Sequence, residues 1–198
     1  MQVKLLDHTR LDVADTAISK CWDKSVTSDK VCERMERVAN KNKHASTIEH
    51  LVYNFDIDGI SRACLQEVAR HRIASYSVKS TRYTLKELGK EDADIYEFYV
   101  KSGEPLVDNA LFDQLYTLHE LIRGTTIAND KLKYCLPEAY KTSLVMSINA
   151  RSLQNFLELR SSKSALWEIQ DLAAAMYEAL PEDHKFLFTK FVNGLIKV

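Results

Sequence analysis

The sequence predicts an α+β fold that forms a single domain over residues 1–198. Residues 51–58 (LVYNFDID) alternate apolar and polar side chains, as a half-buried β-strand does. Val31, Met35 and Val38 instead recur at the spacing of an amphipathic helix. No internal repeat, low-complexity stretch or obvious linker interrupts the chain, and its length suits one domain. Strands and helices are therefore expected to share one folding unit.

The same patterns predict the elements in order along the chain. Strands are expected at residues 3–8, 51–58, 94–100 and 142–149, and residues 75–85 are expected to pass from a loop into a strand. Helices are expected at residues 14–22, after a cap at Ser28, from 59 to about 70, at 107–124, from about 149, at 164–180 and at 184–192.

Two local signals support these helices. Ile60, Cys64 and Val68 follow one another at intervals of four residues, which predicts a helix that begins near residue 59. Ser46 and Glu49 have the spacing of a capping box, in which each side chain caps a backbone N–H at a helix start.

Composition excludes several classes of protein. The net charge of −1 gives no global attraction to nucleic acid, and no apolar run approaches the roughly 20 residues of a membrane span. The charged N-terminus is unlike a signal peptide, so a cytoplasmic protein is expected. The four cysteines form no C-x-x-C pair, and neither metal-ligand spacing nor a glycine-rich phosphate loop is present. No metal site, nucleic-acid partner or membrane partner is therefore expected.

Basic and hydroxyl side chains concentrate in residues 70–84, RHRIASYSVKSTRYT. Arginine offers two parallel donors, lysine a mobile charge, and serine short hydroxyls, which together suit a small molecule that carries phosphate. The alternative is a solvated basic helix end that offsets the C-terminal helix dipole.

The segment NARSLQNFLELR, residues 149–160, is predicted to form a helix with polar side chains on two faces. Arg151 and Asn155 lie on nearly the same face, whereas Arg160, nine residues beyond Arg151, points to the opposite face. Such a helix could serve two ligands or two pockets at a subunit junction. The alternative is that both arginines form surface ion pairs.

Three blocks resemble the marker stretches of the flavin-dependent thymidylate synthases. The first is RHR, two residues, Ser, four residues, Ser, one residue and Arg, beginning at Arg70 and ending at Arg82. The second is residues 149–160, and the third is KHASTIEHLVYNF, residues 43–55. The resemblance implies a mostly antiparallel sheet flanked by helices, and a homotetramer with FAD at its subunit junctions and active sites shared between chains.

Position by position, the resemblance implies two sets of binding residues and one catalytic residue. The expected FAD-binding residues are His44, Ser46, Arg70, His71, Arg72, Ile73, Asn149, Arg151 and Asn155. The residues expected to bind deoxyuridylate (dUMP) are Gln66, Glu67, Arg70, Val78, Lys79, Ser80, Thr81, Arg82, Lys133 and Arg160. Arg160 is the expected catalytic residue, because its guanidinium can stabilise negative charge on the uracil imide.

The implied reaction converts dUMP to thymidylate, with methylenetetrahydrofolate as carbon donor and NADPH as reductant through FAD. Because a cofactor of this kind performs the difficult steps, no side-chain nucleophile needs to be conspicuous. Cys135 is interpreted as a small buried hydrophobe and Ser80 as a binding residue. Two alternatives stay open: a non-catalytic nucleotide- or RNA-binding module, and a flavoprotein reductase without methyl transfer.

Four positions depart from the family pattern. Ser77 replaces the usual Asn, Val78 stands where relatives often carry a polar residue, and Lys133 replaces an Arg. Ser164 stands where some relatives carry His. Lysine keeps the charge but loses the two-pronged guanidinium, so these changes affect single contacts and leave the predicted activity intact.

Overall fold

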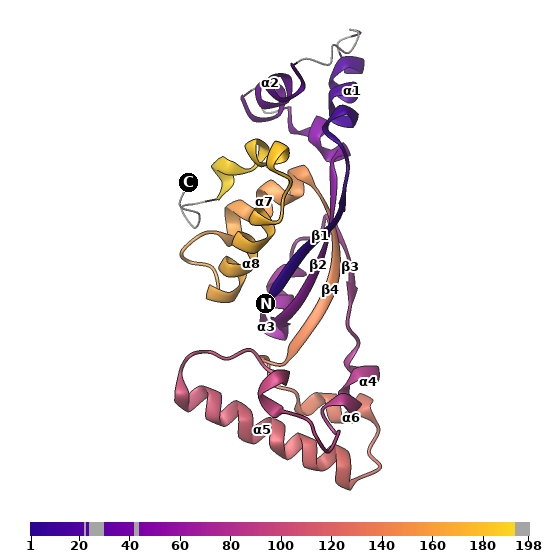
Figure 1. Cartoon of the computed structure of the whole chain (residues 1–198), viewed down its shortest axis with the longest axis vertical. Helices are drawn as coiled ribbons and strands as arrows, with labels where there is room; N and C mark the ends of the chain where they lie inside the picture. The colour runs from indigo at the N-terminus through magenta and orange to yellow at the C-terminus, as the bar shows by residue number, and fades with distance from the viewer. Residues whose placement is uncertain (22, 24–29, 42–43, 193–198) are drawn as a thin grey trace. The chain divides into compact units, whose positions relative to one another are not determined.

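The computed structural model describes residues 1–21, 23, 30–41 and 44–192 (Figure 1). The strands are β1 (Gln2–His8), β2 (Val52–Ser61), β3 (Ala74–Val78) and β4 (Lys141–Asn149). The α-helices are α1 (Leu11–Cys21), α2 (Val31–Met35), α3 (Arg62–Val68), α4 (Thr81–Thr84), α5 (Pro105–Gly124), α6 (Asn129–Leu132), α7 (Ala150–Arg160) and α8 (Trp167–Glu178). Residues Glu36–Lys41 (η2) form a π-helix. Short 3-10 helices are η3 (Ala45–His50), η4 (Leu85–Glu87), η5 (Ile95–Phe98), η6 (Lys133–Cys135), η7 (Glu182–Leu187) and η8 (Thr189–Phe191).

The four strands form one sheet in the order β1-β2-β4-β3. The end of β1 meets the start of β2, because the Thr9 N–H donates to the Val52 carbonyl at 2.9 Å. In the same way, the Ala150 N–H after β4 donates to Leu51 before β2, and the Lys79 N–H after β3 donates to Ser143 in β4. Each neighbouring pair is therefore antiparallel. The predicted α+β class and mostly antiparallel sheet are confirmed.

Alternation along β2 explains its place in the sheet. Leu51, Tyr53, Phe55 and Ile57 are fully buried, while the residues between them are less buried or exposed. This period of two puts one face of the strand against the core. Gly59 has a φ of 75°, a conformation that favours glycine, and β2 continues to Ser61 instead of giving way to a helix at residue 59.

Contacts between residues divide the chain into two compact units. The first comprises Met1–Ile57, Val68–Ser77 and Val145–Val198, and the second comprises Asp58–Glu67 and Val78–Leu144. Strands β2 and β4 each contribute residues to both units. The single domain over residues 1–198 stays a prediction.

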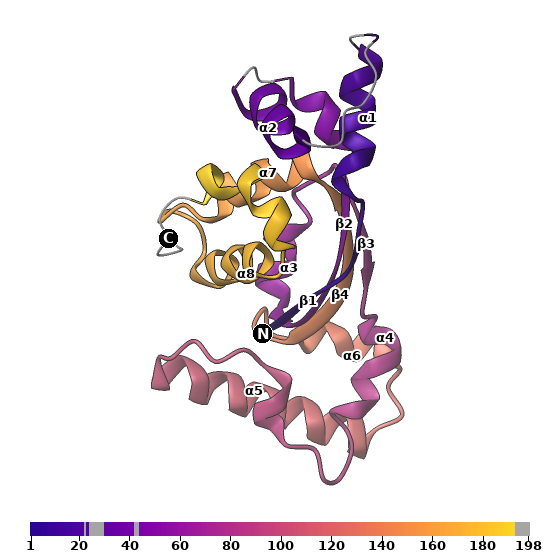
Figure 2. The same ribbon diagram turned by 45° about the horizontal axis from the view of Figure 1, so that its top comes forward.

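In the first unit, α7 and α8 lie on the same side of the strands (Figures 1 and 2). Helix α7 buries Leu153, Phe156 and Leu157, and helix α8 buries Ile169, Leu172 and Met176. These side chains recur at intervals of three or four residues and so form one apolar stripe on each helix. The core of this unit lies between those stripes and the sheet.

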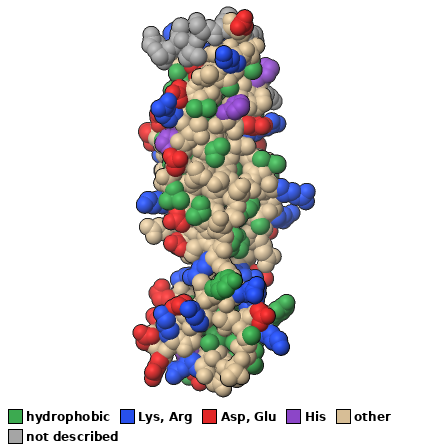
Figure 3. Space-filling view, turned by 90° about the vertical axis from the view of Figure 1, so that its right-hand side faces the viewer, with side chains coloured by type: hydrophobic (Ala, Val, Ile, Leu, Met, Phe, Trp, Pro, Cys, Tyr) green, Lys and Arg blue, Asp and Glu red, His purple; other side chains and the backbone are tan. Residues whose placement is uncertain are grey.

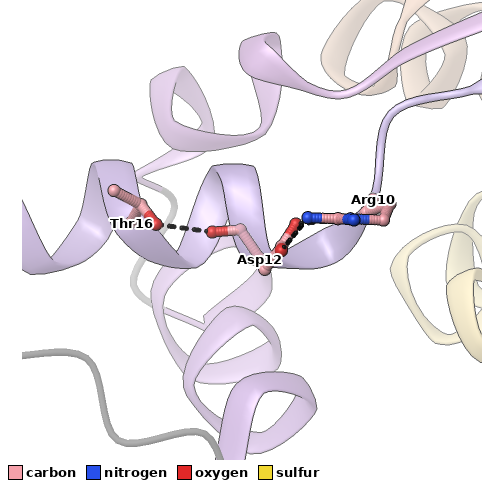
Figure 4. Close-up of polar contacts among 3 residues, drawn as sticks. All are labelled: Arg10, Asp12 and Thr16. Atoms are coloured by element: carbon pink, nitrogen blue, oxygen red, sulfur yellow. Dashed lines mark hydrogen bonds and ion pairs between the residues drawn. The ribbon is translucent and has the colours of Figure 1, made fainter.

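Helices α1 and α2 are joined by a partly buried ion pair. The guanidinium of Arg34 contacts both carboxylate oxygens of Asp15 at 2.7 and 2.8 Å, and Asp15 is fully buried. At the start of α1, Arg10 pairs with Asp12 at 2.6 Å and the Thr16 hydroxyl donates to the Asp12 carbonyl (Figure 4). The first pair is structural, whereas the second is solvated and contributes little to stability.

The second unit has its own apolar core under α5. Its buried members are Leu85, Leu88, Ile95, Tyr99, Leu115, Leu118, Leu132 and Tyr140. On the face drawn in Figure 3, lysine and arginine side chains gather with acidic ones over the part of the chain that forms this unit.

None of the helices in the described ranges is both long and apolar enough to cross a membrane.

Several predicted elements are wrong, because local hydrogen bonds turn the backbone. The predicted strand at 94–100 contains the 3-10 helix η5, since the Asp94 carboxylate accepts the Tyr96 N–H at 3.0 Å. The helix predicted from residue 59 begins at Arg62 instead, where the Ser61 hydroxyl accepts the Cys64 N–H at 2.9 Å. Ser46 caps no helix, because η3 already begins at Ala45.

The remaining differences between the predicted and the observed structure concern short segments and single residues. Residues 75–85 are predicted to pass from a loop into a strand, whereas strand β3 comes first and helix α4, which was not predicted, follows it. Residues 184–192 form no α-helix, and most of them lie in the two 3-10 helices η7 and η8. Cys135 is exposed, which contradicts its interpretation as a small buried hydrophobe. Trp22, the predicted cap Ser28 and Lys43 lie outside the described residues.

Candidate active site

The first unit contains a cavity of about 960 Å³. Its walls come from the segment after α3, from helix α7, from the loop after α7 and from η3. The lining residues are Glu49, Arg70, His71, Arg72, Ile73, Asn149, Arg151, Ser152, Asn155, Leu159, Arg160, Ser164 and Ala165. Seven of the nine predicted FAD-binding residues and the predicted catalytic arginine therefore meet in one place.

Hydrogen bonds hold the Arg70–Arg72 segment in the wall of the cavity. The His71 N–H donates to the carbonyl of Val68, the last residue of α3, at 3.1 Å. The hydroxyl of Tyr76 in β3 donates to the His71 carbonyl at 2.6 Å and contacts the Val68 carbonyl at 3.1 Å. The chain is thus bound on both sides of the turn that presents the two arginines.

Asn149 positions the start of α7 at the cavity. Its side-chain oxygen accepts the Ser152 N–H at 2.8 Å, which makes it the N-cap of the helix. The next N–H, of Ala150, donates to the Leu51 carbonyl at 2.8 Å and ties the helix start to the sheet. The predicted helix start near Asn149 is confirmed.

Arg151 and Arg160 line the same cavity, although they are nine residues apart on α7, and the prediction that they point to opposite faces of the helix stays a prediction. Arg160 is the last residue of α7, and its Nε–H donates to the Nε2 atom of His71 at 2.8 Å. Helical side chains lean towards the N-terminus of their helix, so a long terminal arginine reaches over the preceding turn. The guanidinium groups of Arg151 and Arg160 can therefore border one cavity although the two residues are about half a turn apart around the helix axis.

The cavity is strongly cationic. Four arginines line it, at positions 70, 72, 151 and 160, together with a single carboxylate, Glu49. Glu49 Oε1 accepts from Arg151 Nη1 at 2.6 Å, and both side chains are about half exposed. Arginine side chains that converge on a concave surface bind anions with paired hydrogen bonds.

His44 and Ser46, the other two predicted FAD-binding residues, are not among the lining residues. His44 is exposed and precedes η3, where its carbonyl accepts the Thr47 hydroxyl at 2.9 Å. Ser46 lies within η3 and is exposed. Their predicted roles stay predictions.

The predicted dUMP-binding residues other than Arg70 and Arg160 belong to the second unit. Val78 ends β3, Ser80 precedes α4, and Thr81 and Arg82 open that helix. Helix α4 packs on α6, which leads directly to Lys133 in η6. An amide hydrogen of Asn129 in α6 donates to the Arg82 carbonyl at 3.2 Å. The segments that carry Arg82 and Lys133 are thus neighbours in this unit.

Gln66 and Glu67 lie near the end of α3. The Gln66 amide donates to both carboxylate oxygens of Glu138 at 2.8 and 2.9 Å. Gln66 is therefore held by Glu138 within the second unit, and a ligand contact would have to share its amide group.

Sequence reasoning missed Glu49, Ser152, Leu159 and Ala165 as lining residues, and it missed Tyr76 as the support of the Arg70–Arg72 turn. Glu49 was assigned to a capping box, so its pairing with Arg151 was not predicted. Leu159 and Ala165 carry no chemical signal in a sequence. Within the described ranges, no group of three or more His, Cys, Asp or Glu side chains could hold a metal ion.

The fold and the cavity define an α+β protein with an arginine-lined cavity suited to an anionic ligand. A family model described as thymidylate synthase complementing protein matches residues 4–184. The flavin-dependent thymidylate synthase of Wolinella succinogenes is 54% identical over 200 residues, which cover 95% of this chain and 97% of the relative. That of Campylobacter jejuni is 54% identical over 199 residues, which cover 95% of this chain and 96% of the relative.

Solved structures agree with these relatives. A crystal structure of thymidylate synthase X from Helicobacter pylori with FAD and dUMP matches with a TM-score of 0.91 and 44% identity. The match covers 98% of this chain and 100% of that chain. The chain therefore belongs to the family of flavin-dependent thymidylate synthases.

Proposed function

We propose that this chain methylates dUMP to thymidylate with FAD as cofactor, methylenetetrahydrofolate as carbon donor and NADPH as reductant. The observation that carries this proposal is the position of Arg160 in the same cavity as seven predicted FAD-binding residues. A flavin held there would lie beside the guanidinium expected to act on the uracil ring. The family to which the chain belongs supports the reaction type.

The volume and the lining side chains of the cavity suit FAD. Its volume of about 960 Å³ lies at the upper end of the range for sites of organic cofactors. Arg70, Arg72 and Arg151 can neutralise a diphosphate, because guanidinium groups match phosphate oxygens in pairs. Asn149 and Asn155 offer amide groups to the polar edge of a flavin ring.

The same cavity offers apolar surface for the ring itself. Ile73, Leu159 and Ala165 line it, and the Ile73 side chain is about two-thirds exposed there. An apolar wall beside charged and amide groups is the usual composition of a cofactor site. When bound, FAD supplies the hydride-transfer chemistry that protein side chains lack.

The protein's own contribution is to bind, orient and stabilise charge. Arg160 would donate hydrogen bonds to the uracil carbonyl oxygens and stabilise negative charge on the imide, which makes the reacting ring carbon more nucleophilic. Lys79, Arg82 and Lys133 would bind the nucleotide phosphate, and the Ser80 and Thr81 hydroxyls would complete its hydrogen bonds. Gln66, Glu67 and Val78 would border the nucleotide, and His44 and Ser46 would complete the flavin site.

We infer a homotetramer in which active sites draw on several chains. Its support is the family to which the chain belongs. Leu106 in the first turn of α5 is 87% exposed and is one apolar side chain that another chain could cover. Light scattering during gel filtration should give the mass of four chains.

We also infer a cytoplasmic location, where the nucleotide and NADPH are found.

The alternatives differ in measurable ways. A non-catalytic phosphate-binding module, which the family relationship disfavours, would bind RNA in a salt-sensitive manner and take up no flavin. A reductase without methyl transfer would bind flavin and consume NADPH without forming thymidylate.

The test is formation of thymidylate from labelled dUMP by the purified protein, with each component left out in turn. Product should appear only when FAD, NADPH and methylenetetrahydrofolate are all present. Consumption of NADPH without product would support the reductase, and RNA binding without flavin uptake would support the binding module. Either result would overturn the proposal.

A further inference from the structure

His71 holds Arg160 through a bond whose direction is defined. The Arg160 Nε–H can only donate, so the Nε2 atom of His71, 2.8 Å away, must accept. An imidazole nitrogen that accepts carries no hydrogen. His71 is therefore neutral in this arrangement, with its proton on Nδ1.

The surroundings keep the His71 ring in place. Its side chain packs on the ring of Phe156, with 4.7 Å between the centroids, and His71 is only 7% exposed. Phe156 lies one turn before Arg160 on α7, so the ring and the guanidinium are supported by the same helix. The Tyr76 hydroxyl fixes the main chain of His71 from the other side, at 2.6 Å from its carbonyl oxygen.

This arrangement orients Arg160 in a way that suits charge stabilisation. A guanidinium has five N–H donors in one plane, and anchoring Nε restricts the directions in which the other four can point. Because the acceptor in this bond is neutral, the bond orients the guanidinium without itself cancelling any of its charge. A preorganised donor of this kind costs no reorientation when charge develops on a ligand.

We propose that His71 is a positioning residue for Arg160, and that Tyr76 supports it by holding its main chain. This role adds to the flavin contact expected of His71. The consequence for dUMP rests on the function proposed above, whereas the bond itself can be tested without any ligand.

The first experiment examines the unmutated protein without ligands. Nitrogen-15 NMR of the histidine rings distinguishes the two neutral tautomers and the imidazolium, and a His71→Gln variant identifies the signals of His71. We expect Nδ1 to carry the proton and Nε2 to be bare. A proton on Nε2 would overturn the proposal, because that nitrogen could not then accept from Arg160.

The second experiment is a double-mutant cycle on the protein loaded with FAD, with dUMP affinity as the readout. His71→Phe keeps a ring against Phe156 but removes the acceptor. We expect it to weaken dUMP binding about tenfold in the parent, the scale of a hydrogen bond to a charged group. In an Arg160→Met background the same change should have less than about a twofold effect. His71→Gln, whose amide oxygen can accept near the Nε2 position, should recover most of the affinity.

An equal loss in both backgrounds would overturn the proposal, since it would show that His71 acts on dUMP independently of Arg160. If His71→Phe fails to fold or to take up FAD, Tyr76→Phe replaces it, because that change removes no group lining the cavity. We expect it to weaken dUMP binding about threefold, again only when Arg160 is present. A parent protein that binds neither FAD nor dUMP would refute the proposed function, and the NMR result would then decide the positioning role by itself.

Discussion

At the scale of single residues, the cavity depends on how its guanidinium groups are held. Arg160 is bound by a neutral imidazole at 2.8 Å and Arg151 by the Glu49 carboxylate at 2.6 Å. Of these two bonds, the one to Glu49 brings a negative charge to its arginine and the one to His71 does not.

Arg160→Ala should lower the rate of thymidylate formation by about 100-fold or more, because it removes a donor aimed at developing charge. FAD affinity should change by no more than a few-fold. The matched control is Arg10→Ala, which removes an arginine paired with Asp12 outside the cavity (Figure 4). Steady-state rates and a flavin titration measure both effects. Loss of flavin from Arg160→Ala would mean that its ligand has been assigned wrongly.

His184 should make stability depend on pH. It is 1% exposed, its Nδ1 lies 2.8 Å from the Tyr53 hydroxyl, and its ring meets His8 edge-on. Burial lowers the pKa of His184 below its ordinary value of 6.5; nearby His8 lowers that pKa too, and Asp183 opposes both. Burial also raises the pKa of the Tyr53 hydroxyl, which therefore stays protonated and able to donate.

The direction in which stability changes with pH follows from proton binding. Below pH 6.5 the unfolded chain protonates this histidine before the folded chain does, so the free energy of unfolding should fall as the pH drops from 6.5 to the folded-state pKa. Urea unfolding at several pH values measures this slope. His184→Asn keeps an acceptor for Tyr53 but cannot titrate in this range, so it should flatten the slope, while His50→Asn at an exposed position should not. An unchanged slope in His184→Asn would refute this account.

At the scale of elements, the start of α7 contributes both to the stability of the helix and to the cavity. Asn149 caps the helix and also lines the cavity, so one side chain serves both purposes. The sequence was a good guide here, because a capping residue, a helical pattern and a preceding strand agree on the boundary. It was a poor guide at residues 94–100, where an Asp94 side-chain bond overrides the strand pattern of the apolar residues.

Asn149→Ala should lower the free energy of unfolding by about 1 kcal/mol through the lost cap and should also weaken FAD binding. Asp94→Ala is the matched control, because Asp94 caps η5 in the second unit and lines no part of the cavity. Both variants should lose stability, but only the first should lose flavin affinity. Thermal unfolding and flavin titration separate the two effects, and equal flavin affinity in both variants would contradict the assignment of Asn149.

At the scale of the whole molecule, the α+β class and most of the cavity could be predicted from sequence. The alternation of apolar residues from Leu51 to Ile57 correctly predicted a buried strand face. The marker residues Arg70 to Arg72 correctly predicted part of the cavity wall. The pairing of Arg160 with His71 joins residues 89 positions apart, and no local pattern encodes it. The division of contacts into two units also depends on long-range packing, so it was not predicted.

The measurement that tests the central claim most directly is the absorbance spectrum of the purified protein, recorded again after addition of FAD and then of dUMP. If FAD and dUMP occupy neighbouring sites, bound flavin bands should appear and should change shape when dUMP is added. A colourless protein that takes up no added FAD, or flavin bands that ignore dUMP at every concentration, would contradict the account.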